Sequence, residues 1–231
     1  MAVSGTYNFN LDIDEVIQEA TEMIGGEDTL GHTPATARRS INLMLKDWQN
    51  RGILLWSTST TAVTVVADTT AYDLASSTIN ALEVVISRDN TDIKLTRITP
   101  EEYLIIPAKT QTGKPNQYSV RRGRDNSVMS VWPIPENSTD ILKIEIVKEL
   151  EDTNKSADQN ADVPKRFLPA LTCGLAYYLS MKRTPPLAAE AVWASKIAML
   201  KTNYEEILGR AMEEDRERAS IYLLPRLTFY N

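Results

Sequence analysis

The hydrophobic positions of the C-terminal third of the chain recur with the spacing of two helices, and the second helix is unusually long. Apolar residues in this second run return at steps of three and four from Trp193 to Ala211, with charged residues between them. The run from Pro186 to about Arg218 would extend over roughly 50 Å, which exceeds the need of one compact domain. We therefore expect part of it to contact something outside its own core. The residues expected in an inter-helix core or at a subunit contact are Trp193, Ile197, Leu200, Tyr204 and Ile207.

Two further helices are predicted near the N-terminus. Apolar residues between positions 13 and 24 share one helical face, acidic residues occupy the first turn, and Gly25 follows. A second apolar face spans residues 37–48. It is preceded by Thr33 and Pro34, which are typical residues for a helix start. Because these two helices have no neighbouring strand in the sequence, we expect them to pack against the C-terminal helices.

The middle of the chain alternates apolar and polar residues with a period of two, which predicts short antiparallel strands. Polar turn residues separate two pairs of these strands, so each pair is predicted to form a β-hairpin. Five or six such strands indicate a small sandwich or open barrel inserted between two helical halves. The expected strands cover residues 57–66, 81–87, 93–98, 117–121, 127–132 and 141–149.

One short helix is expected inside this strand-rich region. Thr99 is followed by Pro100 and, three residues after itself, by Glu102, which is the sequence of a capping box. Such a box satisfies backbone donors at the start of a helix. The helix should end near Ile106.

Together these patterns predict an α+β fold with a helical bundle, an inserted small antiparallel β-sandwich or barrel, and an extended C-terminal tail. The helical bundle is drawn from the N- and C-terminal thirds of the chain. The expected parts are residues 11–53 and 163–218 for the bundle, 54–150 for the β-module, 151–162 for an exposed loop, and 219–231 for the tail.

The tail is unusually apolar for a segment that follows a charged helix end. On one interpretation it folds back onto its own subunit. On the other it is a docking peptide for another subunit, which binds by strand addition or by placing alternate side chains in pockets. Pro225 prevents an ordinary continuation of the helix. The residues expected to dock are Ile221, Tyr222, Leu223, Leu224, Leu227, Phe229 and Tyr230.

Composition narrows the class of protein. The 231 residues are 42% hydrophobic, which is enough for a substantial core, and no stretch has the length and apolarity of a membrane span or a signal peptide. We therefore expect a globular protein that works or assembles in the cytosol, with no membrane. The net charge of −6 argues against tight binding of nucleic acid. We therefore expect DNA to pass this protein without being bound.

Candidate catalytic groups are few. His32 and Cys173 are the single histidine and the single cysteine, so a His/Cys metal cluster and an internal disulfide are both excluded, and Cys173 is expected to be a buried, inert thiol. Gly113, Lys114 and Pro115 lack the glycine spacing of a phosphate-binding loop. We therefore expect no enzyme, no cofactor and no metal, although carboxylates distant in the sequence could still assemble a hydrolase.

Several short motifs follow one another in a distinctive order over roughly residues 11–218. Their order and spacing resemble those of the head-to-tail adaptor proteins of short-tailed double-stranded DNA bacteriophages, which are also called head-completion, connector or tail tubular A proteins. The motifs are Asp47-Trp48, Gly52-Ile53, Leu55-Trp56, Tyr72-Asp73-Leu74, Glu102-Tyr103, Ile106-Pro107, Gly113-Lys114-Pro115, Trp132-Pro133 and Val163-Pro164.

The resemblance implies a structural role in a virion. In that family many copies, commonly twelve, form a homo-oligomeric ring under the portal protein, and the C-terminal segment of each copy binds the portal. The resemblance further implies that the ring extends the DNA channel and offers a platform to tail nozzle or fibre proteins. The expected location is the neck between capsid and tail, after assembly in the host cytoplasm. The family supplies no catalytic residue to carry over.

A carbohydrate- or protein-binding module that acts through the β-insertion is the alternative. Tyr103, Tyr118 and Trp132 are its candidates for stacking on a ligand. Each of these aromatic residues also fits a position in the core. Burial of their rings therefore separates the two interpretations.

Overall fold

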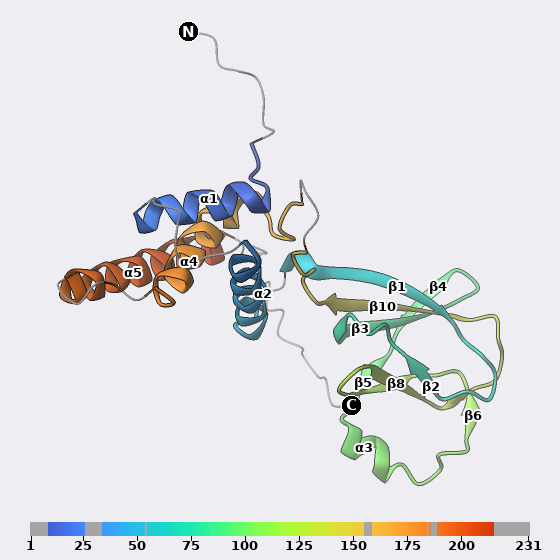
Figure 1. The fold of residues 1–231 in the computed structure, drawn as a ribbon. Coiled ribbons are helices and arrows are strands. Elements are labelled where there is room, and N and C mark those ends of the chain that lie inside the picture. The colour runs from blue at the N-terminus through green and yellow to red at the C-terminus, as the bar shows by residue number, and fades with distance from the viewer. Residues whose placement is uncertain are drawn as a thin grey trace, which may run out of the picture. The chain divides into compact units, whose positions relative to one another are not determined.

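The computed structural model describes residues 9–25, 34–53, 55–154, 159–183, 185 and 189–214, and the chain divides into two compact units. The fold is α+β, as the sequence predicted, with helices and antiparallel sheets (Figure 1). The helical unit contains α1 (Ile13–Ile24), α4 (Leu168–Ser180) and α5 (Glu190–Glu214), and the strand-rich unit contains the sheets. The division falls inside α2 (Pro34–Asn50), between Ile41 and Asn42, whereas the sequence placed it after residue 53.

A capping box starts α1. The backbone N–H of Glu15 donates to Oδ1 of Asp12 at 2.7 Å, and the backbone N–H of Asp12 donates to the Glu15 carboxylate at 3.0 Å. Gly25 ends the helix at φ 127°, a conformation that side chains disfavour. The buried face of α1 consists of Ile13, Val16, Ala20 and Ile24, as the sequence spacing predicts.

The central helix of the helical unit is α4, which packs against both α1 and α5. Its residues are apolar on nearly all sides, and a helix of this kind is stable only when it is surrounded. A short 3₁₀ turn, η2 (Lys165–Phe167), precedes it and buries Phe167. Pro169 lies in the first turn, where its missing N–H costs nothing.

The buried stripe of α5 consists of Leu200, Tyr204, Leu208 and Ala211. The steps of four, four and three residues keep these side chains on one face. Of the five residues singled out in the sequence, Leu200 and Tyr204 are buried, while Trp193, Ile197 and Ile207 are half-buried. The ring of Tyr204 stacks on that of Tyr177 from α4, with centroids 6.3 Å apart. The buried face of α5 is therefore rotated toward Leu208 relative to the face expected from the sequence.

Two four-stranded sheets and one two-stranded pair form the strand-rich unit (Figure 1). The first sheet has the order β1-β10-β3-β4, the second has the order β2-β8-β7-β5, and β6 pairs with β9. The short 3₁₀ helix η1 (Leu55–Ser57) leads into β1, and α3 (Pro100–Ile105) follows β5. The strands are β1 (Thr58–Thr64), β2 (Ala71–Asp73), β3 (Thr78–Arg88), β4 (Thr91–Lys94), β5 (Thr96–Arg97), β6 (Thr112–Gly113), β7 (Gln117–Arg122), β8 (Ser127–Trp132), β9 (Ile134–Pro135) and β10 (Ile141–Lys148).

Side chains from both four-stranded sheets form one apolar core. Ile86, Leu142 and Ile144 come from the first sheet, and Tyr118 and Met129 come from the second. Their alternation along each strand explains the period of two in the sequence.

Both predicted hairpins are present. β3 pairs with β4 across a two-residue turn, in which Asp89 and Asn90 have φ values of 50° and 59°. Two positive values in succession are typical of the tight turn that suits the twist of a hairpin, and Asp and Asn tolerate them. β7 pairs with β8 in the second sheet.

The segment 93–98 was predicted to be one strand, and the structure divides it between the two sheets. β4 pairs with β3, the chain then buries Leu95 in the core, and β5 pairs with β7 in parallel. β6 and β9 form a second parallel pair. These pairs are two residues long, too short to produce a recognisable period in the sequence.

The loop 151–162 was expected to be exposed, and in its described part Thr153 is a buried anchor. Oδ1 of Asn42 accepts hydrogen bonds from both the backbone N–H and the hydroxyl of Thr153, each at 2.8 Å, and Nδ2 of Asn42 donates to the Thr153 carbonyl at 3.2 Å. Thr153 is buried as a result. These bonds attach the loop to the C-terminal part of α2.

Candidate interaction surfaces

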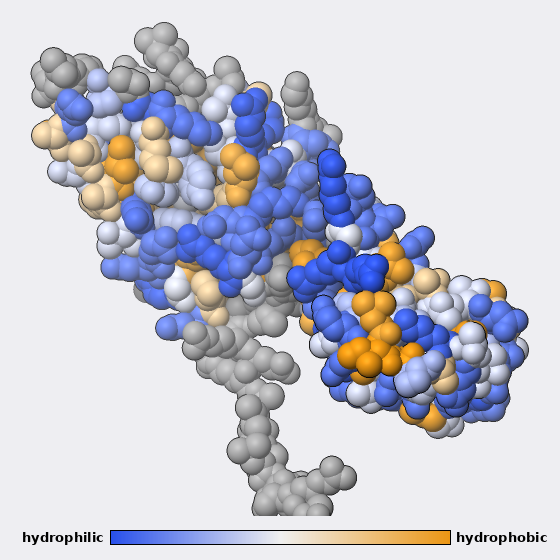
Figure 2. Space-filling view, turned by 90° about the horizontal axis from the view of Figure 1, so that it is seen from below, coloured by the Kyte–Doolittle hydropathy of each residue, from blue (hydrophilic) through white to orange (hydrophobic). Residues whose placement is uncertain are grey.

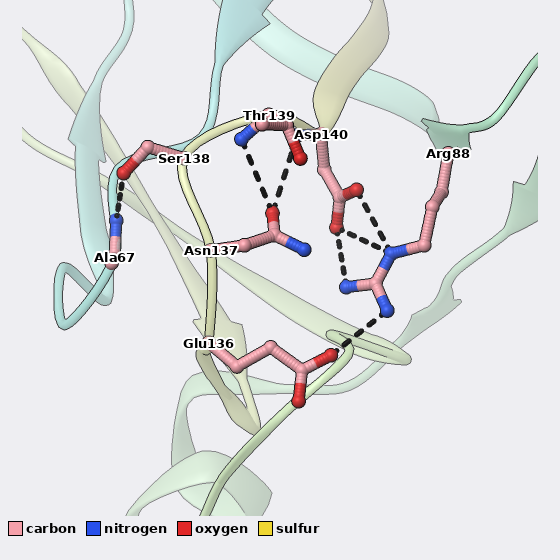
Figure 3. A network of polar contacts seen from close by, with 7 residues as sticks. All are labelled: Ala67, Arg88, Glu136, Asn137, Ser138, Thr139 and Asp140. Atoms are coloured by element: carbon pink, nitrogen blue, oxygen red, sulfur yellow. Dashed lines mark hydrogen bonds and ion pairs between the residues drawn. The ribbon is translucent and has the colours of Figure 1, made fainter.

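A cluster of charged side chains joins the end of β3 to the loop before β10 (Figure 3). The Arg88 guanidinium donates to Oδ1 of Asp140 from Nε at 2.9 Å and to Oδ2 from Nη2 at 2.7 Å. Nη1 of Arg88 donates to Glu136 at 2.8 Å. The Asp140 side chain is only 1% exposed, so its charge depends on this two-pronged contact. The hydrogen bonds to Asp140 and then to Glu136 raise the pKa of Arg88 above its usual value.

The backbone of the same loop is also held. Oδ1 of Asn137 accepts from the backbone N–H groups of Thr139 and Asp140 at 3.2 and 3.3 Å, and the Ser138 hydroxyl accepts from the backbone N–H of Ala67 at 3.0 Å (Figure 3). The polar groups of the cluster are thus bonded to one another, which indicates a structural clamp. Within the described ranges, no group of three His, Cys, Asp or Glu side chains is placed to hold a metal ion.

The three aromatic residues considered for ligand stacking lie in different surroundings. Tyr118 is 2% exposed, and its hydroxyl donates to the Leu82 carbonyl at 3.0 Å, so its ring is part of the core. Trp132 is half-buried, and its Nε1 donates to the Ala108 carbonyl at 3.1 Å. The Lys109 ammonium lies 5.9 Å from the ring centroid of Tyr103. The three rings therefore do not form one open stacking platform.

Beside the second sheet, α3 exposes apolar side chains. Leu104 is 59% exposed and Ile105 is 75% exposed, and no residue of α3 is buried. Figure 2, which views the molecule from the side on which α3 lies in Figure 1, shows hydrophobic side chains gathered on this part of the strand-rich unit. An exposed apolar patch on an ordered element is a candidate contact site for another molecule.

A shallow hollow lies between α3 and the outer face of strands β7 and β8. Along β7 and β8, Tyr118, Val120 and Met129 point into the core, so Ser119, Arg121 and Val128 line the opposite face. Pro100, Tyr103 and Leu104 form the α3 side of the hollow. We call this surface the α3 surface; it consists of Pro100, Tyr103, Leu104, Ile105, Arg121 and Val128.

The helical unit exposes a second apolar pair on α5. Val192 is 74% exposed and Met199 is 55% exposed, and their separation of seven positions corresponds to about two helical turns. By contrast, Trp193 on the neighbouring face is held, because its Nε1 donates to the Ser180 carbonyl at 3.3 Å and Arg183 lies 5.2 Å above its ring. Val192 and Met199 are thus a candidate subunit contact.

Burial shifts the pKa of two titratable groups in the helical unit. Burial, and then the charge of Glu19, raises the pKa of the Cys173 thiol, which is therefore protonated and unreactive at neutral pH. Nζ of Lys182 donates to the Ser40 hydroxyl at 2.5 Å, and burial, followed by the charge of Arg39, lowers its pKa. Among the described residues, neither group has the convergent partners that catalysis requires.

Two sets of residues singled out in the sequence lie outside the described residues. One is His32, and the other is the predicted docking set of Ile221, Tyr222, Leu223, Leu224, Leu227, Phe229 and Tyr230. The Arg88 cluster was not singled out in the sequence, and of the α3 surface only Tyr103 was, as a candidate for stacking on a ligand. The apolar run 104–106 was a signal for the α3 surface, whereas Arg88 and Asp140 are 52 residues apart and share no local motif.

Comparison with known proteins gives one finding. A family model described as SU10 adaptor protein matches residues 11–224, which include both the helical unit and the strand-rich unit. No curated protein matches the chain. None of the described helices has the length and apolarity that crossing a bilayer demands.

Proposed function

The chain belongs to the SU10 adaptor protein family, a family of phage head-tail adaptors, and on this premise we propose that it forms a ring below the portal protein of a virion. In this proposal the C-terminal tail docks to the portal, the ring extends the DNA channel, and tail proteins attach to the ring. The observation that carries the proposal is the family match over residues 11–224, because it includes both units and the start of the tail.

Ring closure requires that each copy offer two different surfaces, since a heterologous contact joins unlike patches. The exposed Val192 and Met199 of α5 support one of these surfaces. Both are large apolar side chains on an ordered helix that already has a separate buried stripe. We propose that this face of α5 contacts the next copy in the ring.

The sequence of the tail supports portal docking. Residues 219–231 contain many large apolar and aromatic side chains directly after the charged stretch 213–218 of the sequence. A peptide of this composition gains affinity by placing side chains in pockets of a partner. We propose that Tyr222, Leu224 and Phe229 are among its anchors.

The charge of the chain supports passage of DNA through the ring. Proteins that grip DNA do so with Lys and Arg, which release the counterions of the phosphates. A net charge of −6 does not favour such a grip. We propose that the surface that lines the channel is not dominated by basic side chains.

Removal of residues 220–231 tests portal docking. The truncated chain should remain folded and keep the oligomeric state of the full chain, but it should lose binding to the purified portal protein in sedimentation or surface-based binding assays. A full-length variant with Tyr222→Ala and Leu224→Ala should bind more weakly, and Thr228→Ala serves as its matched control. Unfolding of the truncated chain would instead assign the tail to the core of its own subunit.

A further inference from the structure

We propose that the α3 surface is the docking site for a tail protein, and that the partner presents apolar side chains flanked by carboxylates. This inference rests on the proposed adaptor function and deepens it, because it assigns the attachment of the tail to named residues. Four features of the strand-rich unit support it: exposure, rigidity, shape and charge.

Exposure is the first feature. Leu104 and Ile105 are 59% and 75% exposed, and they are adjacent on a helix of six residues that buries none of its side chains. Apolar side chains that stay exposed add little to stability, because they remove little apolar surface from water. Leu104 and Ile105 therefore fit a function outside the unit better than a role in its folding.

Rigidity is the second feature. The Thr99 hydroxyl accepts from the Glu102 backbone N–H at 3.1 Å, and the Glu102 carboxylate accepts from the Thr99 backbone N–H at 2.7 Å. The segment after α3 is held by the Trp132 indole, which donates to the Ala108 carbonyl. Since both ends are fixed, a partner would bind without the entropy cost of ordering this segment.

Shape and chemistry of the hollow are the third feature. Pro100, Tyr103, Leu104 and Val128 offer apolar walls, and Arg121 supplies a guanidinium at the same hollow. An apolar side chain of a partner fits between the walls, while a neighbouring carboxylate accepts from Arg121. The described structure assigns Arg121 no carboxylate partner of its own within the strand-rich unit.

Charge is the fourth feature. Residues 95–125 contain six Lys or Arg and three Asp or Glu, which is a net charge of +3. The whole chain has a net charge of −6, so the remaining residues together carry −9. The segment around α3 therefore has a positive net charge on an acidic protein, with Glu101 and Glu102 on α3 itself and Arg121 at the hollow. The Arg121 side of the hollow thus attracts a partner surface with carboxylates.

Two other occupants fit this surface less well. Nucleic acid would place charged phosphates against Leu104 and Ile105, which offer them no hydrogen bond. A second copy of this chain could offer its exposed apolar pair Val192 and Met199 to the α3 surface. The residue between them on the same face of α5 is Ser195, so this pair lacks the flanking carboxylates. Compared with nucleic acid and with the Val192 and Met199 face of a second copy, the combination of apolar and basic groups therefore favours a protein of another kind.

The test uses phage particles produced with the altered full-length chain. In the variant with Leu104→Ser and Ile105→Ser, the ratio of adaptor to portal in purified particles should equal that of the wild type. The ratio of tail proteins to adaptor should fall by about ten-fold or more, since central apolar contacts dominate binding. Quantitative mass spectrometry of the particles measures both ratios. Normal tail content would overturn the inference.

A charge variant and two matched controls sharpen the result. Arg121→Glu should also reduce the tail content, and Arg121→Lys should reduce it less. Val66→Ser removes an apolar side chain that is 51% exposed elsewhere on the strand-rich unit, and Lys148→Glu reverses an exposed charge on β10. Both controls should leave the tail content unchanged. Equal losses in the controls and in the α3 variants would overturn the inference.

A photo-crosslinking amino acid in place of Ile105 identifies the occupant in assembled particles. A cross-link to a tail protein supports the inference, whereas a cross-link to a second adaptor copy, to DNA, or to no partner overturns it. Particles in which even the wild-type chain is absent from the junction of portal and tail would contradict the proposed adaptor function itself. The two failures are therefore distinguishable.

Discussion

Asp140 illustrates, at the scale of single residues, how one buried carboxylate holds a loop. Its side chain is 1% exposed, and Arg88 binds both of its oxygens. A buried charge of this kind is stable only while its partner is present. The clamp therefore couples the end of β3 to the loop that enters β10.

We predict that Asp140→Asn lowers the free energy of unfolding by about 2–3 kcal/mol, because Arg88 keeps Glu136 but loses its buried partner. Urea-induced unfolding measures the change. Asp92→Asn is the matched control: it breaks the exposed pair with Lys143 and should have a smaller effect. Equal effects of the two substitutions would contradict the special role of the buried site.

Cys173 gives a prediction on pH dependence. Its folded-state pKa is raised by burial, so above the ordinary pKa of a thiol the unfolded chain loses a proton that the folded chain retains. The contribution of Cys173 to stability is therefore complete at neutral pH and decreases as the pH rises through the folded-state pKa. Unfolding measured from pH 7 to 10 should show a steeper loss for the wild type than for Cys173→Ala. Parallel pH profiles would contradict this assignment.

At the scale of elements, α5 shows that hydrophobic periodicity can predict a helix without deciding which of two neighbouring residues is buried. The sequence spacing favoured Ile207, whereas the structure buries Leu208 at 1% exposure and leaves Ile207 half-buried. Both residues fit an apolar stripe with steps of three and four. The packing of α5 within the helical unit decides between them.

The two neighbouring residues provide a matched pair for mutation. We predict that Leu208→Ala costs about 2–5 kcal/mol of unfolding free energy, because it leaves a cavity in a packed core. Ile207→Ala should cost clearly less, since part of its side chain already contacts water. Thermal and urea unfolding of both variants measures the difference. A larger loss of stability for Ile207→Ala would mean that Ile207, and not Leu208, faces the core.

At the scale of the whole molecule, the proposed ring depends on surfaces that are exposed in the single chain. We predict that Val192→Asp combined with Met199→Asp prevents ring formation, since two charges would be buried at the proposed contact. Native mass spectrometry with and without the portal protein measures the oligomeric state. The melting temperature of the variant chain should match that of the monomeric wild type, because both side chains are exposed.

Val66→Asp controls for the addition of charge, since Val66 is also exposed but lies on the strand-rich unit. It should leave the ring intact. Rings of unchanged size in the α5 variant would show that this face of α5 is not a subunit contact.

The sequence by itself determined the features that rest on neighbours three or four residues apart. The capping box of Thr99 with Glu102, the helical spacing of α1, and the tight turn at Asp89 and Asn90 are local interactions. The order of the motifs also indicated the adaptor family, which the family match confirms.

Only the tertiary structure decided which of these local elements meet. It joined Arg88 to Asp140 across 52 residues, divided the segment 93–98 between two sheets, and left Leu104 and Ile105 exposed although their helix was foreseen. A short helix has no periodicity long enough to define a buried face, and contacts between distant segments depend on how the chain closes. The surfaces proposed for assembly therefore became visible only in the folded chain.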